Sequence, residues 1–174
     1  MESRRRQIRI TAVRWTLYTL IMLLAATFQS MPGFLAFGAF KPNFLLGVAI
    51  AVALYEGEFR GALFGAVCGL LWDYLAGRTV GMLALCLMLL CFFVSILVQL
   101  YLKPSTVNFI LIMLGAGLLL LSTDFLFFYW MPGYANPAWR YLTVVLPEVL
   151  ASAALGAITN QIIKAIANRF TLIS

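Results

Sequence analysis

Histidine is absent from this 174-residue sequence, and charged residues make up only 10% of it. Without an imidazole the chain can build neither a Ser-His or Cys-His nucleophile pair nor a histidine metal site. The three cysteines, Cys68, Cys86 and Cys91, show no CxxC spacing and lie inside apolar runs, which indicates small buried side chains. These absences exclude most catalytic sites and predict that the protein binds no metal and no cofactor.

Apolar residues are abundant instead, at 64% of the sequence with a mean hydropathy of +1.00. A soluble domain of this size carries roughly 45–50% apolar residues, so this chain has too little polar surface to cover a water-soluble globule. The composition predicts an all-α polytopic membrane protein. We expect one integral membrane domain over 1–174, preceded at 1–12 by a basic cytoplasmic segment of the same chain.

Turn residues and charges divide the apolar sequence into runs of membrane-crossing length, which is about 20 residues. The second run is short for a crossing, unless the stretch 34–40 joins it as a re-entrant segment. The expected helices are 13–30, 43–55, 60–76, 80–102, 106–129 and 140–165. Six crossings would return the chain to the side on which it started.

The distribution of lysine and arginine predicts the orientation, because cytoplasmic flanks carry the excess of these residues. The cations expected inside are Arg4, Arg5, Arg6, Arg9, Arg14, Arg60, Lys103, Lys164 and Arg169. Those expected outside are Lys41, Arg78 and Arg140. Both termini are therefore predicted to be cytoplasmic in a plasma-membrane protein, and the net charge of +6 requires no nucleic-acid partner. The basic start could belong to a signal peptide, but no clear small-x-small cleavage site follows, so we expect a retained first helix.

Three acids, Asp73, Asp124 and Glu148, fall within predicted crossings, in the outer half or the middle of the membrane. An ionisable side chain at the bilayer centre costs about 2.5–3.5 kcal/mol on insertion scales, so each acid needs an explanation. Three cations are expected at the same face: Lys41, Arg78 and Arg140. This outer polar cluster is interpreted as helix packing, a ligand pocket open to the outside, or a docking surface for a partner. A proton pathway is disfavoured because no acid was assigned to the inner half of a crossing.

A glycine recurs every four residues through the third run, and the series continues to Asp73 and Gly77. Small residues at this spacing let a neighbouring helix approach closely. The repeating positions are Gly57, Gly61, Gly65 and Gly69. They predict a groove that leads toward Asp73 and receives either another helix of this chain or a partner.

Several of these features occur together between about residues 41 and 90, in a fixed order. They are Lys41-Pro42-Asn43, Glu58-Phe59-Arg60-Gly61, the Gly61–Gly69 repeat, Leu70-Leu71-Trp72-Asp73, Gly77 and Gly81. This ordered set resembles the rod shape-determining protein MreD family, in which aspartate often stands at the position of Asn43. The candidate partner-binding or packing residues are Lys41, Asn43, Gly61, Gly65, Gly69, Asp73, Arg78, Asp124, Arg140 and Glu148.

The resemblance implies a non-enzymatic scaffold of the bacterial inner membrane that maintains rod shape. Its partners would be MreC and, through it, the MreB filament, RodA and a penicillin-binding transpeptidase, which together direct side-wall peptidoglycan synthesis. The fold is similar to that of the substrate-binding membrane subunits of energy-coupling-factor vitamin transporters, which supplies the alternative function. Such a subunit should present an Ala-xxx-Ala face on its first helix, where this chain offers only Ala12 and Thr16. A membrane enzyme ranks third, because no nucleophile-base pair is visible.

Overall fold

A computed structural model of the chain describes residues 2–31, 33, 41–77, 81–102, 105–133 and 137–171. All regular structure in this part of the chain is helical. The elements are α1 (Glu2–Ser30), α2 (Phe44–Glu56), α3 (Glu58–Leu75), α4 (Met82–Leu100), α5 (Thr106–Phe125), η1 (Leu126–Trp130), α6 (Pro137–Arg140), η2 (Tyr141–Val145) and α7 (Leu146–Thr171). The predicted all-α class is confirmed, and each expected crossing falls on one of these helices or on a continuous run of them. The proposed re-entrant stretch at 34–40 lies outside the described residues.

Four helical stretches in the described residues are long and apolar enough to cross a membrane. They are Gln7–Ser30, Met82–Leu100, Thr106–Trp130 and Pro137–Arg169. The two remaining long helices differ from these: α2 has 13 residues, and α3 carries Glu58, Arg60 and Asp73. The protein is therefore a membrane protein with at least four apolar helices of crossing length.

The short helix α2 forms the centre of the molecule. Every residue from Leu45 to Leu54 is buried, and the helix packs against α1, α3, α4 and α7. A helix that is apolar around its whole circumference must be covered on all sides, because no face of it favours water. Helix α2 is thus the core around which the longer helices are arranged.

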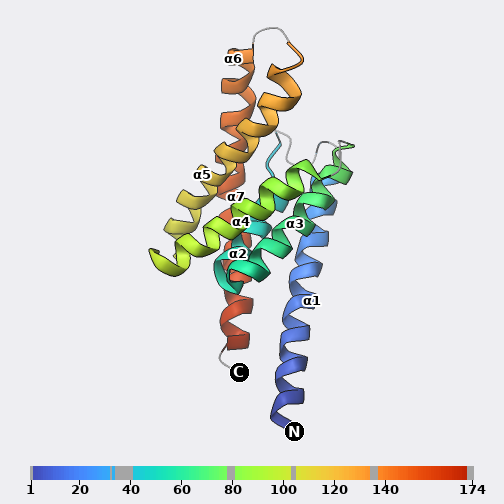
Figure 1. The fold of residues 1–174 in the computed structure, drawn as a ribbon, viewed down its shortest axis with the longest axis vertical. Helices are drawn as coiled ribbons and strands as arrows, with labels where there is room; N and C mark the ends of the chain where they lie inside the picture. Colours follow the sequence, from blue (N-terminus) through green and yellow to red (C-terminus); the bar gives the residue numbers. More distant parts are fainter. Residues whose placement is uncertain are drawn as a thin grey trace.

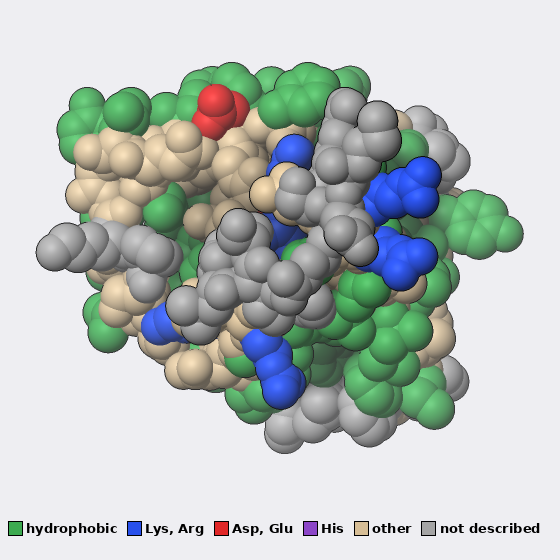
Figure 2. Space-filling view, turned by 90° about the horizontal axis from the view of Figure 1, so that it is seen from below, with side chains coloured by type: hydrophobic (Ala, Val, Ile, Leu, Met, Phe, Trp, Pro, Cys, Tyr) green, Lys and Arg blue, Asp and Glu red, His purple; other side chains and the backbone are tan. Residues whose placement is uncertain are grey.

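Cations gather at one end of the molecule. The N-terminal part of α1 and the C-terminal part of α7 lie at one end, here called the terminal end, whereas α6 lies at the opposite, distal end (Figure 1). Lysine and arginine side chains gather on the face seen from the terminal end (Figure 2). Helices α1 and α7 bring cations to it, including Arg5, Arg9, Lys164 and Arg169.

Helix α1 begins at Glu2, far ahead of the expected start at residue 13. The added turns contain four arginines with one glutamate and one glutamine, which are good helix formers but give no apolar signal. Hydropathy therefore located the membrane part of α1 and missed its polar extension at the terminal end.

Two five-residue π-helical turns, η1 and η2, lie near the distal end. Each ends two residues before a proline, Pro132 or Pro147. Pro147 has no N–H to bond the carbonyl of Thr143, and its ring would crowd that carbonyl. The chain instead bonds over five residues, with the Leu146 N–H donating to the Tyr141 carbonyl. The prolines thus account for turns that the apolar pattern does not predict.

Candidate functional site

Two adjoining cavities at the distal end collect most of the polar residues singled out in the sequence. The first, of about 330 Å³, is lined by Gln29, Ser30, Lys41, Pro42, Asn43, Trp72, Leu75, Ala76, Leu121, Asp124 and Glu148. The second, of about 220 Å³, is lined by Leu121, Asp124, Phe125, Phe128, Tyr129, Arg140, Val144, Val145 and Glu148. Asp124 and Glu148 line both cavities, so we refer to the two cavities together as the distal polar cavities.

Lys41 closes the C-terminal end of α1. Its Nζ donates to the main-chain oxygens of Gln29 at 2.5 Å and Met31 at 2.6 Å. Carbonyls at a helix C-terminus have no partner within the helix and carry partial negative charge, so a lysine is favourable there. Gln29 in turn accepts a bond from the Leu45 N–H through its Oε1, at 3.2 Å. These contacts fix α1 against the start of α2.

Asn43 opens α2 and joins it to α7. Its Oδ1 accepts from the Leu46 N–H at 3.2 Å, which is the bond of an N-cap residue. Its own N–H donates to the Ser152 Oγ at 2.7 Å, and that hydroxyl donates to the Glu148 main-chain oxygen at 2.6 Å. The cap needs only an oxygen acceptor, so asparagine and aspartate can both serve at this position.

Asp124 on α5 and Glu148 on α7 are half-buried between the two cavities. Lys41 shares the first cavity with them, and Arg140 shares the second. The guanidinium of Arg140 lies 4.9 Å from the centre of the Tyr129 ring, in a cation–π arrangement. The structure therefore brings together four of the charged residues expected in the outer polar cluster.

Asp73 is placed differently from these four residues. It is 1% exposed, and its Oδ2 accepts from the Gly81 N–H at 2.8 Å, so it joins the end of α3 to the start of α4. Its neighbour Trp72 lines the first cavity, but Asp73 lines neither cavity. The sixth member of the expected cluster, Arg78, lies outside the described residues.

The glycine groove of α3 is occupied by other helices of the same chain. A Cβ placed on Gly69 would lie against Ala84 Cα and 2.8 Å from the Ala84 main-chain nitrogen, both on α4. At Gly65 it would meet Cys91 Sγ at 2.7 Å, and at Gly61 it would meet Ala53 Cα of α2 at 2.8 Å. Real Cβ atoms essentially never come this close to such neighbours. The repeat thus allows α3 to pack against α4 and α2 at backbone distance.

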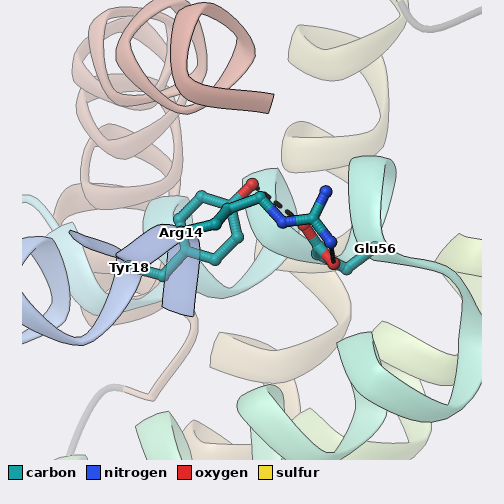
Figure 3. A network of polar contacts seen from close by, with 3 residues as sticks. All are labelled: Arg14, Tyr18 and Glu56. Atoms are coloured by element: carbon teal, nitrogen blue, oxygen red, sulfur yellow. Dashed lines mark hydrogen bonds and ion pairs between the residues drawn. The ribbon is translucent and has the colours of Figure 1, made fainter. Parts of the chain in front are cut away.

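A buried ion pair joins the middle of α1 to the C-terminal end of α2 (Figure 3). Arg14 donates to Glu56 Oε2 at 2.9 Å, with side-chain exposures of 15% and 1%, and the Tyr18 hydroxyl donates to Oε1 at 3.0 Å. The crossings expected at 43–55 and 60–76 leave Glu56 in the inner loop between them, and Arg14 is expected only as a cation that sets the orientation. The loop position is wrong, because α2 continues to Glu56 and the carboxylate is buried against Arg14. Arg14 and Glu56 carry opposite charges and are expected at the same depth in the membrane. This was the sequence signal that could have revealed the pair.

The same end of α2 carries a second polar contact, to α7. The Tyr55 hydroxyl donates to Asn160 Oδ1 at 3.2 Å, and Asn160 is fully buried. Among the described residues its Nδ2 has no hydrogen-bond partner. The polar ends of α2 are therefore both attached to α7, through Ser152 at one end and Asn160 at the other.

An apolar groove of about 580 Å³ separates α4 from α5. Its lining is Cys86, Leu89, Leu90, Phe93, Val94, Leu97, Ile112, Gly115, Ala116 and Leu119. A Cβ on Gly115 would meet nothing within 4 Å, so the α5 backbone is accessible at that point. This surface contains no charged side chain and faces the region between two helices of crossing length.

Within the described residues, no group of three Cys, Asp or Glu side chains is arranged to hold a metal ion. All three cysteines are free, and Cys68 and Cys91 are buried in the helix packing. The described residues thus offer polar groups at the distal end and an apolar surface along α4 and α5.

The family comparison extends well beyond the residues that carried the resemblance. The sequence model of the family described as rod shape-determining protein MreD matches residues 9–163. Comparison with curated proteins and with solved structures gave no match. The match covers every described helix at least in part, including the distal polar cavities and the buried Arg14–Glu56 pair. The chain therefore belongs to the MreD family of rod shape-determining proteins.

Proposed function

We propose that this protein is a scaffold of the bacterial inner membrane that binds MreC and thereby helps to direct side-wall peptidoglycan synthesis. Through MreC it would act with the MreB filament, RodA and a penicillin-binding transpeptidase. Family membership supports the role in rod shape. Scaffolding performs no chemistry: partner binding stabilises one arrangement of the assembly.

The proposed topology has six crossings with both termini in the cytoplasm. Its support is the common position of the two chain ends and the gathering of cations on that face (Figures 1 and 2). Helices α2 and α3 would complete the count, because packing covers the short α2 on all sides and buries Asp73 of α3. Alkaline phosphatase fusions at either terminus should be inactive and a fusion after residue 133 active; active terminal fusions would contradict the topology.

The apolar groove between α4 and α5 is the observation that carries the proposed interaction. Association of helices within a membrane depends on close packing, which small residues permit. Gly115 and Ala116 line the groove, so the transmembrane helix of a bitopic partner can approach the α5 backbone there. We propose that the helix of MreC occupies it.

Co-purification in mild detergent tests this interaction. Gly115→Leu fills the groove without meeting another helix of the chain, and it should reduce recovery of tagged MreC at least fivefold. The matched control is Ala154→Leu, which adds the same bulk at an exposed position of α7 outside the groove. Equal recovery of MreC with both variants would place the interface elsewhere. In cells depleted of their own MreD, Gly115→Leu should also fail to restore rod shape.

The vitamin-transporter alternative has less support from the surface of α1. Its exposed face carries large side chains, Leu20, Leu23, Leu24 and Phe28, rather than a stripe of small residues for an energising module. The same purified protein can be incubated with a panel of radiolabelled vitamins. Tight vitamin binding without recovery of MreC would overturn the scaffold proposal.

A further inference from the structure

We propose that the terminal end of the protein binds the headgroups of anionic phospholipids, and that these headgroups hold the first turns of α1 in the helix. The surface is here called the terminal basic patch, and its residues are Arg5, Arg9, Lys164 and Arg169. Figure 2 shows lysine and arginine side chains gathered on this face. The proposal goes beyond the scaffold function and does not depend on it.

The described part of the chain does not neutralise the cations of the terminal basic patch. Arg5, Arg9 and Arg169 are exposed, and Lys164 is half-buried. The one ion pair within the described residues, which joins α1 to α2, contains no member of the patch. The charge of the patch is therefore available to anions outside the protein.

Arg14 shows how the same helix treats a cation that lies deeper in the membrane. It belongs to the expected membrane segment 13–30, and its guanidinium is paired with the buried Glu56 carboxylate at 2.9 Å. A charge in the hydrocarbon needs a partner within the protein, because lipid tails offer none. Arg9 and Arg5 precede this segment by four and eight residues. They lie about 6 and 12 Å before it along the helix, where a different partner can serve.

These positions correspond to the polar layer of a bilayer. Headgroups add about 5–7 Å on each side of the hydrocarbon core, and an arginine side chain extends several ångströms to reach them. On α7, Lys164 lies in the last turn of the expected crossing 140–165, and Arg169 lies four residues beyond it. Four residues of helix are about 6 Å, the same distance as for Arg9 on α1. Two helices thus bring cations to the depth of the lipid phosphates.

The helical state of the first turns of α1 itself favours an anionic surface. Residues 2–12 contain four arginines at the N-terminal end of the helix. Cations are unfavourable beside the partial positive charge of a helix N-terminus, and Arg5 and Arg9 repel each other at a spacing of four residues. Gln7 and Ile8 are exposed as well, so packing against other helices does not hold these turns. Lipid phosphates would offset both penalties, because guanidinium–phosphate bonds are charge-assisted.

The net charge of the headgroup decides which lipid should bind. A zwitterionic lipid such as phosphatidylcholine carries its own cation, which compensates the phosphate. Phosphatidylglycerol carries a net negative charge, and each basic residue near an anionic surface contributes about a fivefold gain in affinity. The terminal basic patch should therefore prefer phosphatidylglycerol to phosphatidylcholine.

Hydrogen exchange of the full-length protein in nanodiscs tests whether this lipid holds the helix. Amides of residues 6–12 are followed, because the first four N–H groups of a helix are unbonded in any case. Exchange should be at least tenfold slower in discs of phosphatidylglycerol than in discs of phosphatidylcholine. Salt at about 1 M should abolish the difference, because it screens charges beyond about 3 Å. Equal exchange in the two lipids, or a difference that salt leaves unchanged, would overturn the proposal.

Native mass spectrometry of protein released from discs with equal amounts of both lipids measures the preference directly. The wild type should retain at least tenfold more phosphatidylglycerol than phosphatidylcholine, and Arg5→Gln/Arg9→Gln should reduce this ratio at least fivefold. Glutamine is nearly as good a helix former as arginine, so the change removes charge without breaking the helix. The matched control, Arg5→Lys/Arg9→Lys, keeps both charges and should stay within threefold of the wild type.

An unchanged ratio in the glutamine variant would also overturn the proposal, and would leave these arginines to membrane orientation or to an acidic segment of another protein. The comparison of two lipids uses the wild-type chain, so it decides the matter even if the glutamine variant inserts incorrectly. Binding is measured on the folded protein after reconstitution, which separates it from any effect of the cations on insertion.

Discussion

Replacing Gly69 by alanine should destabilise the protein, although alanine is the better helix former. The added Cβ would lie against Ala84 Cα, 2.8 Å from the Ala84 nitrogen and 2.9 Å from the Leu83 carbonyl oxygen. Carbon atoms in contact normally lie about 3.5–4.0 Å apart, so α3 and α4 would have to separate by about 1 Å. All three neighbours belong to the α4 backbone or Cα trace and cannot move aside by changing rotamer.

The expected magnitude follows from two opposing effects. Overpacking in a close-packed interior costs about 1–3 kcal/mol, and Gly→Ala within a helix recovers about 0.5–1 kcal/mol. The contact at Gly69 is with backbone, so we expect the upper part of this range and a net loss of about 2 kcal/mol in the free energy of unfolding.

Unfolding by increasing SDS in mixed micelles, followed by circular dichroism, measures this change. The matched control is Gly115→Ala, since a Cβ there meets nothing within 4 Å. Gly115→Ala should leave the unfolding free energy unchanged or raise it. If both variants unfold alike, within about 0.5 kcal/mol, the close approach of α3 and α4 does not limit what position 69 can hold.

Three further predictions use the same unfolding assay. Arg14→Met leaves the Glu56 carboxylate buried without its cation and should lower the free energy of unfolding by about 3–5 kcal/mol. Adding Glu56→Met to this variant should recover much of the loss. A double variant no more stable than the single variant would contradict a buried pair. Asn43→Ala should cost about 1 kcal/mol through loss of the α2 cap, whereas Asn43→Asp keeps the acceptor and should stay close to wild type. Asp73→Ala should cost about 1–3 kcal/mol because the half-buried Gly81 N–H loses its acceptor, and a smaller loss with Asp73→Asn would show that the hydrogen bond matters more than the charge.

Most helix positions could be predicted from the sequence because apolar runs and turn residues mark the membrane part of each helix. The short run expected at 43–55 corresponds to α2 at Phe44–Glu56, and the run at 106–129 corresponds to α5 together with η1. The start of α1 was missed because a polar helical extension has no hydropathy signal. The π-helical turns were missed because they depend on prolines that follow them, not on apolar spacing.

The candidate site was predictable in part. Depth along a helix can be counted from sequence, which predicts Asp124 and Glu148 at a similar level, and in the structure both line the distal polar cavities. The side of a helix on which a given side chain lies depends on which neighbouring helix packs there. Asp73 faces Gly81 and lines neither cavity. Contacts such as Arg14 with Glu56 join residues 42 positions apart, and no local pattern specifies such a pairing.

The enclosed position of α2 imposes an order on biogenesis. A 13-residue helix extends about 20 Å, which is less than the roughly 30 Å hydrocarbon core. The ribosome releases α2 long before α7, yet α7 supplies Ser152 and Asn160 to its two polar ends. A nascent chain that stops before α7 therefore holds a short helix whose Asn43 N–H and Tyr55 hydroxyl lack their partners on α7. Arrival of the last helix is therefore the step that gives both polar ends of α2 their final hydrogen-bond partners.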